Sequence, residues 1–136
     1  MFNKRDVVNC IDTVFSVICM KRNLVGSLYL AKAIELTVEN NGYLYGGLMK
    51  KLYPEIAKIY NTDADKVERG VRYAIDECYK NGKIVLLNEI FKTKIFDINI
   101  KPKNGEFIAL ISDKIKLKLS CDECLADNDF RFFDLM

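Results

Sequence analysis

The chain has 136 residues, half of them hydrophobic, with a net charge of +2 and no histidine. This length is typical of one domain, and the apolar content is enough for a core without disulfides or a structural metal. No apolar stretch reaches the roughly 18 residues of a membrane-spanning helix, and nothing resembles a signal peptide, so we expect a cytoplasmic protein with no membrane contact.

The hydrophobic pattern predicts an all-α fold of about six helices, without the β-strands of a winged helix. Apolar residues recur at close to a 3.6-residue period from Lys4 to Met20 and again from Ser27, a candidate N-cap, to Val38. The stretch ENNGYLYGG then interrupts the pattern with glycines and asparagines. A third helix is expected from about Leu48 to Tyr60, where Pro54 must start, kink or reset it.

The second half of the chain continues in the same way. Asp63 can cap a fourth helix, which Gly82 ends as a C′ glycine, and a short apolar helix follows over Val85 to Phe91. The stretch KTKIFDINIKPKN is either extended or a loop. Asn104 is a candidate cap for a last helix over Glu106 to Leu119.

Charge divides the chain into a helical domain, residues 1–119, and an acidic C-terminal tail, residues 120–136. The domain holds 20 Lys and Arg against 14 Asp and Glu, whereas the tail holds one arginine against five acidic residues. A basic body fits a domain that binds a polyanion, although a solvated surface with an irregular acidic end would show the same pattern. From Ser120 we expect irregular structure.

The cysteines and the missing motifs argue against an enzyme and against any cofactor or metal. Cys121 and Cys124 form the one C-x-x-C pair, but zinc would want a second pair or histidines, and no βαβ pattern suggests a redox site. Two reduced thiols in a tail are the favoured interpretation. The chain also lacks a nucleophile elbow and a glycine-rich phosphate loop.

The segment from Tyr53 to Arg72 predicts a helix-turn-helix in the middle of the domain. Ala57 is small enough for a second helix to approach, and Asn61 readily adopts the left-handed conformation that a tight turn needs. Asp63 then starts the next helix, whose apolar stripe begins at Val67. Such an arrangement commonly places its second helix in the major groove of DNA.

The outward face of that second helix carries charges of both signs. With Val67 at zero and 100° per residue, the charged sector spans about 100° to 200°. It holds Asp65, Glu68, Arg69, Arg72 and Asp76. Arginine suits guanine O6 and N7, and glutamate can accept from cytosine N4, so Glu68, Arg69 and Arg72 are the candidate base-contacting residues.

Six lysines could reach phosphates, which position a protein on DNA without specifying sequence. They are Lys50, Lys51, Lys58, Lys66, Lys80 and Lys83. An ordinary solvated helix with i,i+4 ion pairs, Glu68–Arg72 and Arg72–Asp76, remains the alternative.

Three stretches within residues 26–119 resemble one family: LYPEIA, VERGVRYAI and KPKNGEFIALISDKIKL. The family is that of the C-terminal DNA-binding effector domain of the sporulation stage-zero master response regulator of Firmicutes. The resemblance implies a sequence-specific transcription regulator that reads a short G/C-containing promoter element on double-stranded DNA. It assigns base contacts to Glu68, Arg69 and Arg72. It also implies contact with a polymerase sigma factor through Gly82 to Phe91 and a dimer through Glu106 to Leu119.

Two departures from the family pattern matter. Family proteins carry an N-terminal receiver domain that this sequence does not hold, so control by phosphorylation is not carried over. Gly70 lies where the family usually has alanine, which costs about 1 kcal/mol of helix propensity and predicts a difference in DNA reading there. The alternative function is a protein-interaction modulator that pairs with a full-length regulator or sigma factor without activating transcription itself.

Overall fold

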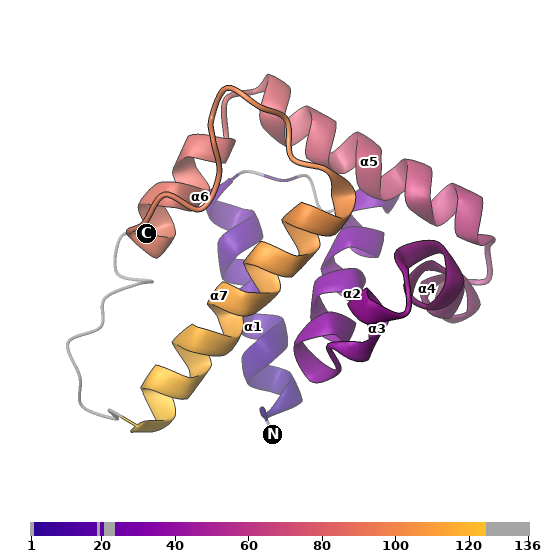
Figure 1. Cartoon of the computed structure of the whole chain (residues 1–136), viewed down its shortest axis with the longest axis horizontal. Coiled ribbons are helices and arrows are strands. Elements are labelled where there is room, and N and C mark those ends of the chain that lie inside the picture. Colours follow the sequence, from indigo (N-terminus) through magenta and orange to yellow (C-terminus); the bar gives the residue numbers. More distant parts are fainter. Residues whose placement is uncertain (1, 19, 21–23, 125–136) are drawn as a thin grey trace.

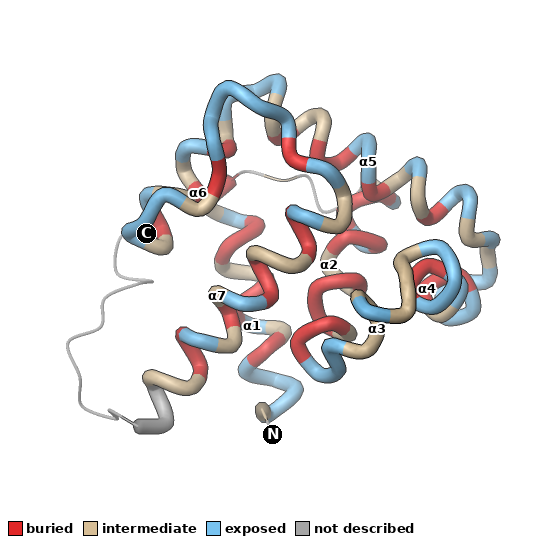
Figure 2. Tube along the Cα trace, in the orientation of Figure 1, coloured by how far each residue is buried: buried red, intermediate tan, exposed pale blue. Residues whose placement is uncertain are grey.

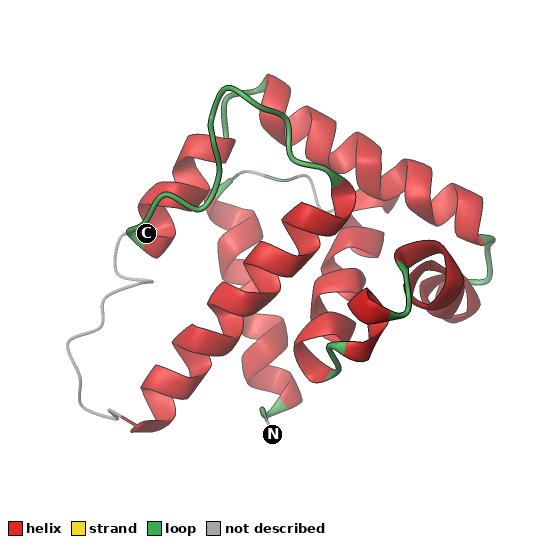
Figure 3. Ribbon diagram, viewed as in Figure 1, coloured by secondary structure: helices red, strands yellow, loops and turns green. Residues whose placement is uncertain are grey.

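Helices make up almost all of the regular structure in the computed structural model, which describes residues 2–18, 20 and 24–124 (Figure 1). The α-helices in this part are α1 (Lys4–Val17), α2 (Val25–Glu39), α3 (Gly42–Tyr45), α4 (Tyr53–Tyr60), α5 (Ala64–Lys80), α6 (Ile84–Phe91) and α7 (Asn104–Cys124). A π-helical turn, η1 (Leu48–Leu52), precedes α4. The all-α prediction is confirmed, and the segment between α6 and α7 is a loop (Figure 3).

Helix α2 lies at the centre of the fold and packs against α1, α4, α5 and α7. Figure 2 shows that most of its length is buried. Even its acidic residue Glu35 is only 7% exposed, and it forms ion pairs with Lys32 at 3.1 Å and Lys4 at 3.7 Å. A buried carboxylate needs such partners, because removing it from water is costly. Lys32 supplies a partner from α2 itself, and Lys4 links this carboxylate to α1.

The closest approach between helices is the crossing of α2 and α5. A methyl group added at Gly26 of α2 would overlap the carbonyl oxygen of Gly70 of α5. A methyl group at Gly70 would lie 2.9 Å from Cδ2 of Tyr29 and 3.2 Å from the Cα of Gly26. Two glycines thus let the backbones touch, and each glycine gives up some helix propensity to make that contact.

Several predicted boundaries are wrong, and each error has a local cause. Ser27 is no cap, because α2 begins at Val25 and Ser27 is fully buried within its first turn. The predicted third helix is divided, and Pro54 starts its second part, α4, which is one of the three roles expected of this proline; in the first turn its missing N–H costs nothing. The preceding residues form a π-helical turn entered through Gly47, whose φ of 94° favours glycine.

The other errors fall at α3 and at both ends of α7. The interruption after Glu39 contains the four-residue helix α3. Asn104 is the first residue of α7, and the chain stays helical through Cys124, so the expectation of irregular structure from Ser120 is wrong for residues 120–124. Residues 125–136, most of the predicted acidic tail, lie outside the described residues. No helix in the described ranges combines the length and apolar content needed to cross a membrane.

The glycine contact predicts that Gly26→Ala destabilises the fold. Alanine is the better helix former, yet its methyl group must push α5 away from α2, and overpacking of this kind costs about 1–3 kcal/mol. The measurement is the free energy of unfolding in urea. Val25→Ala, at a neighbouring position that is 56% exposed, is the matched control and should stay within about 0.5 kcal/mol of wild type. Equal stability of both variants would show that the crossing is not tight.

Candidate nucleic-acid interface

The two helices α4 and α5 are joined by a turn of three residues, Asn61 to Asp63. Asn61 adopts the left-handed conformation, with φ 56° and ψ 54°, as its sequence position predicts. The N–H of Thr62 donates to the carbonyl of Ala57 at 2.9 Å, which closes the end of α4. Ile56 and Ala57 of α4 and Val67 and Val71 of α5 are buried, so this pair of helices packs through the predicted apolar faces.

Both ends of α5 are fixed by local hydrogen bonds. Oδ1 of Asp63 accepts from the N–H of Lys66 at 2.9 Å, which confirms Asp63 as the N-cap. At the other end Gly82, with φ 70°, follows the C-cap Asn81, and the N–H of Lys83 donates to the carbonyl of Cys78 at 3.0 Å. This is the Schellman pattern that a C′ glycine allows. Both ends of α5 are therefore fixed, and with them the positions of the side chains along the helix.

The three candidate base-contacting residues, Glu68, Arg69 and Arg72 (the reading residues), lie together on the outward side of α5. Arg69 is exposed, while Arg72 and Glu68 form an ion pair of 3.0 Å with side chains 51% and 27% exposed. The pair Arg72–Asp76, which the solvated-face alternative also predicts, does not form: Asp76 pairs instead with Lys101 at 2.8 Å. Glu68 thus pairs with the guanidinium of Arg72 and not with that of Arg69.

Gly70 does not belong to this open face. It lies on the flank of α5 that touches Gly26 and Tyr29 of α2. A side chain at this position would meet α2, so the expected difference in DNA reading at Gly70 stays a prediction that would act through the packing of α5 on α2.

The six candidate lysines are not on one surface. Five of them, all but Lys83, are exposed. Lys66 reaches the cap carboxylate of Asp63 at 4.0 Å, beside the start of α5. Lys80 stands eleven residues beyond Arg69, about 16 Å along the axis. The structure thus places Lys66 near the reading residues and Lys80 near the far end of the helix.

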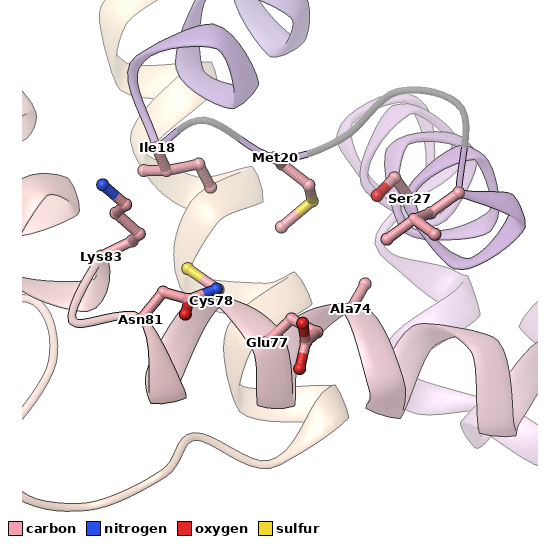
Figure 4. A pocket seen from close by; sticks show the side chains of 9 residues that line it. Ile18, Met20, Ser27, Ala74, Glu77, Cys78, Asn81 and Lys83 are labelled. Atoms are coloured by element: carbon pink, nitrogen blue, oxygen red, sulfur yellow. The ribbon is translucent and has the colours of Figure 1, made fainter.

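Lys83 lines a cavity of about 50 Å³ on the opposite flank of α5, shown in Figure 4. The wall is formed by the ends of α1 and α5 and the start of α2, and it includes Ser27 and Cys78. Burial raises the pKa of the Cys78 thiol to about 12, and the nearby Lys83 ammonium only partly opposes this. The thiol therefore stays protonated and is a poor nucleophile. This cavity is separate from the reading face.

A wider hollow of about 410 Å³ lies directly beside the reading residues. Glu68 and Arg72 line one side, and Lys101 and Lys103 line another. The remaining lining residues are Leu48, Met49, Tyr53, Pro102, Asn104 and Gly105. Sequence reasoning missed the two lysines because they stand in a loop, where no periodicity assigns a residue to a face.

Asn104 joins three helices at the floor of this hollow. Its Nδ2 donates to Oη of Tyr53 at 3.1 Å and to the backbone carbonyl of Glu68 at 3.4 Å. Tyr53 is only 1% exposed, and this burial raises the pKa of its hydroxyl to about 12. The hydroxyl is therefore uncharged at neutral pH. The predicted capping role of Asn104 is wrong: the amide instead ties the first residue of α7 to α4 and α5.

The described part of the chain offers no metal site, since no group of three or more His, Cys, Asp or Glu side chains there is arranged to hold an ion. Cys10, Cys78 and Cys121 are in no disulfide. The side chain of Cys124 and all of Cys19 lie outside what the structure describes.

A helical bundle that presents a capped helix with exposed arginines is an arrangement found in the helical DNA-binding domains of transcription regulators. The family model described as "Sporulation initiation factor Spo0A C terminal" matches residues 11–115. The chain therefore belongs to the Spo0A C-terminal family, which confirms the resemblance found in the sequence. It is a DNA-binding domain of the sporulation transcription-factor type, and this family is regulatory rather than enzymatic.

The match also begins earlier than the sequence indicates. Resemblance was expected from residue 26, whereas the match starts at residue 11, inside α1. Ile11, Val14 and Phe15, in this additional stretch, are buried in the core.

The cap geometry predicts that Asp63→Ala lowers the free energy of unfolding by about 1 kcal/mol, since the N–H of Lys66 loses its acceptor. Asp63→Asn, which keeps a capping oxygen, is the matched control and should retain most of the stability. Urea unfolding of both variants gives the comparison. If alanine and asparagine behaved alike, the carboxylate contact would not stabilise the helix start.

Proposed function

We propose that this domain reads a short G/C-containing promoter element through a helix-turn-helix formed by α4, the turn at Asn61–Asp63 and α5. In this proposal Arg69 and Arg72 contact guanines, and Glu68 orients Arg72 or accepts from cytosine N4. The observation that carries it is a capped helix on which Arg69 is exposed and Arg72 is paired with the partly exposed Glu68. Promoter DNA lies in the bacterial cytoplasm, which is where we propose that the protein acts.

The ion pair between Glu68 and Arg72 is compatible with base reading as well as with a solvated face. A surface ion pair contributes little to stability, typically below about 1 kcal/mol. A guanidinium held in one direction, however, loses less conformational freedom when it meets a base edge. Mixed charges on this face are thus compatible with binding a polyanion, because the acidic partner is neutralised by the arginine beside it.

Phosphate contacts are proposed for Lys50, Lys51, Lys58, Lys66, Lys80 and Lys83. Lys58 and Lys66 have the strongest support, since they are exposed on the two helices that flank the turn. Lys83 has the weakest, because it lines the cavity on the other flank of α5.

Arg69→Ala should weaken binding to the preferred element by about 1–3 kcal/mol and relax the preference at one base pair. The measurement is the dissociation constant for the preferred sequence and for single-base variants, at one stated salt concentration. Lys58→Ala is the comparison: it should weaken all sequences alike and reduce the salt dependence of log K by about 0.9. Equal loss on preferred and scrambled DNA in Arg69→Ala would contradict base reading.

We further propose that Gly82 to Phe91 contacts a sigma factor of RNA polymerase. In this segment Ile84, Leu87 and Ile90 are buried, so α6 is held firmly on the body. Val85 and Glu89 are exposed and give α6 an open face of mixed character. The family resemblance supplies the partner, and the exposed face supplies a place for it.

A homodimer through Glu106 to Leu119 is the other proposed association. Leu117 is 57% exposed on α7, and Leu110 lies one heptad before it on the same side of the helix. Both line a shallow hollow of about 560 Å³ together with Asp113, Lys114, Lys116 and Ser120. The same face would serve the alternative function, in which the protein pairs with a full-length regulator and modulates it.

Leu117→Glu should weaken self-association by about ten-fold or more, because it puts a charge at the centre of the apolar contact. Sedimentation equilibrium over a range of concentrations measures this, on the protein alone and on DNA with tandem sites. Tyr45→Glu, at an apolar residue of α3 that is 87% exposed, is the control and should associate like wild type. Unchanged association of Leu117→Glu would remove α7 from the interface.

A further inference from the structure

The loop between α6 and α7 runs beside the second half of α5. In Figure 1 it arches past the C-terminal end of α5 and descends beside it to the start of α7. Two contacts fix it there: Oη of Tyr79 donates to the carbonyl of Asn99 at 3.1 Å, and Lys101 pairs with Asp76 at 2.8 Å. The loop therefore contacts α5 at Asp76 and Tyr79, while Arg69 and Arg72, nearer the start of the helix, stay exposed.

These contacts influence how α5 can meet DNA. A major groove is about 12 Å wide and admits one helix between two rows of phosphates. Since the loop contacts α5 at Asp76 and Tyr79, the part that carries Glu68, Arg69 and Arg72 is the more accessible one for entering the groove. The phosphate row that borders this part then passes over the hollow between Arg72 and the loop.

The loop presents two lysines to that position. Lys101 and Lys103 are exposed on either side of the buried Pro102, and both line the hollow that Glu68 and Arg72 share. The segment is anchored at its end, because the N–H of Lys103 donates to Glu106 at 3.3 Å and Asn104 bonds to Tyr53 and Glu68. The backbone that carries both lysines is thus held in place, and the ammonium of Lys101 is also fixed by Asp76.

We propose that Lys101 and Lys103 bind the DNA phosphates that border the reading part of α5. This inference rests on the proposed function, since it takes α5 as the element in the groove. Lys101 also neutralises Asp76, whose carboxylate would otherwise face the phosphate row. The loop before α7 is then a second DNA-binding element, remote in the sequence from the arginines that read bases.

The salt dependence of binding to the preferred DNA element by the full chain tests this inference. Lys103→Ala should lower affinity for preferred and scrambled sequences by the same factor and reduce the slope of log K against log salt by about 0.9. Lys103→Arg keeps the charge and should restore the slope. Lys94→Ala removes the same charge from an exposed position in the same loop, outside the hollow, and should bind like wild type.

Lys101→Ala should lose more affinity than Lys103→Ala, because it also leaves Asp76 without its partner. Adding Asp76→Asn to Lys101→Ala should recover part of that loss. Circular dichroism of each variant checks that these exposed substitutions leave the fold intact. The inference is overturned if Lys101→Ala and Lys103→Ala both bind like Lys94→Ala.

Failure of this inference is separable from failure of the proposed function. If Arg69→Ala relaxes base preference while the two loop variants match Lys94→Ala, α5 reads DNA and the loop does not contact it. If wild type shows no preference for any sequence, the base-reading proposal fails first, and the loop inference fails with it.

Discussion

The backbone contact between Gly26 and Gly70 determines where the candidate reading helix lies. Because neither residue has a Cβ, α5 settles directly on α2, the helix around which α1, α4 and α7 also pack. Close-packed interiors transmit small changes in volume, so one methyl group at this crossing would move the whole of α5. The position of the charged face of α5 thus depends on two uncharged glycines on the side of the helix that packs against α2.

The charged face itself combines a fixed and a free arginine. Glu68 holds Arg72, and Asp76 is taken by Lys101, so both acidic side chains beside Arg72 have a basic partner. Local neutralisation lets a face that carries carboxylates lie against a polyanion without large repulsion. The cap at Asp63 and the Asn104 bridge to the carbonyl of Glu68 hold the same stretch of α5 from its two sides.

Local chemistry explains which features could be predicted from the sequence. Asn61, Asp63 and Gly82 act through the backbone of their own neighbours, so a left-handed turn, a cap and a C′ glycine could be assigned to them directly. The 3.6-residue pattern likewise predicts the buried faces of α1 and α5. These assignments needed no knowledge of which helix packs on which. Tertiary contacts explain what could not be predicted. Gly70 resembles a weak point in a helix until Gly26, far away in the sequence, is found against it. Asparagine is a common capping residue, yet the side-chain amide of Asn104 donates to Tyr53 and to the carbonyl of Glu68. Lys101 and Lys103 lie in a loop without periodicity, and only its passage along α5 brings them to the hollow beside Arg72.

The most direct measurement is the selection of bound sequences from random double-stranded DNA by the purified protein at a stated salt concentration. Sequence reading by α5 predicts that a short G/C-containing element emerges, and that Arg69→Ala loses the preference at one position of it. A bound pool with the same sequence composition as the input would contradict base reading by Glu68, Arg69 and Arg72.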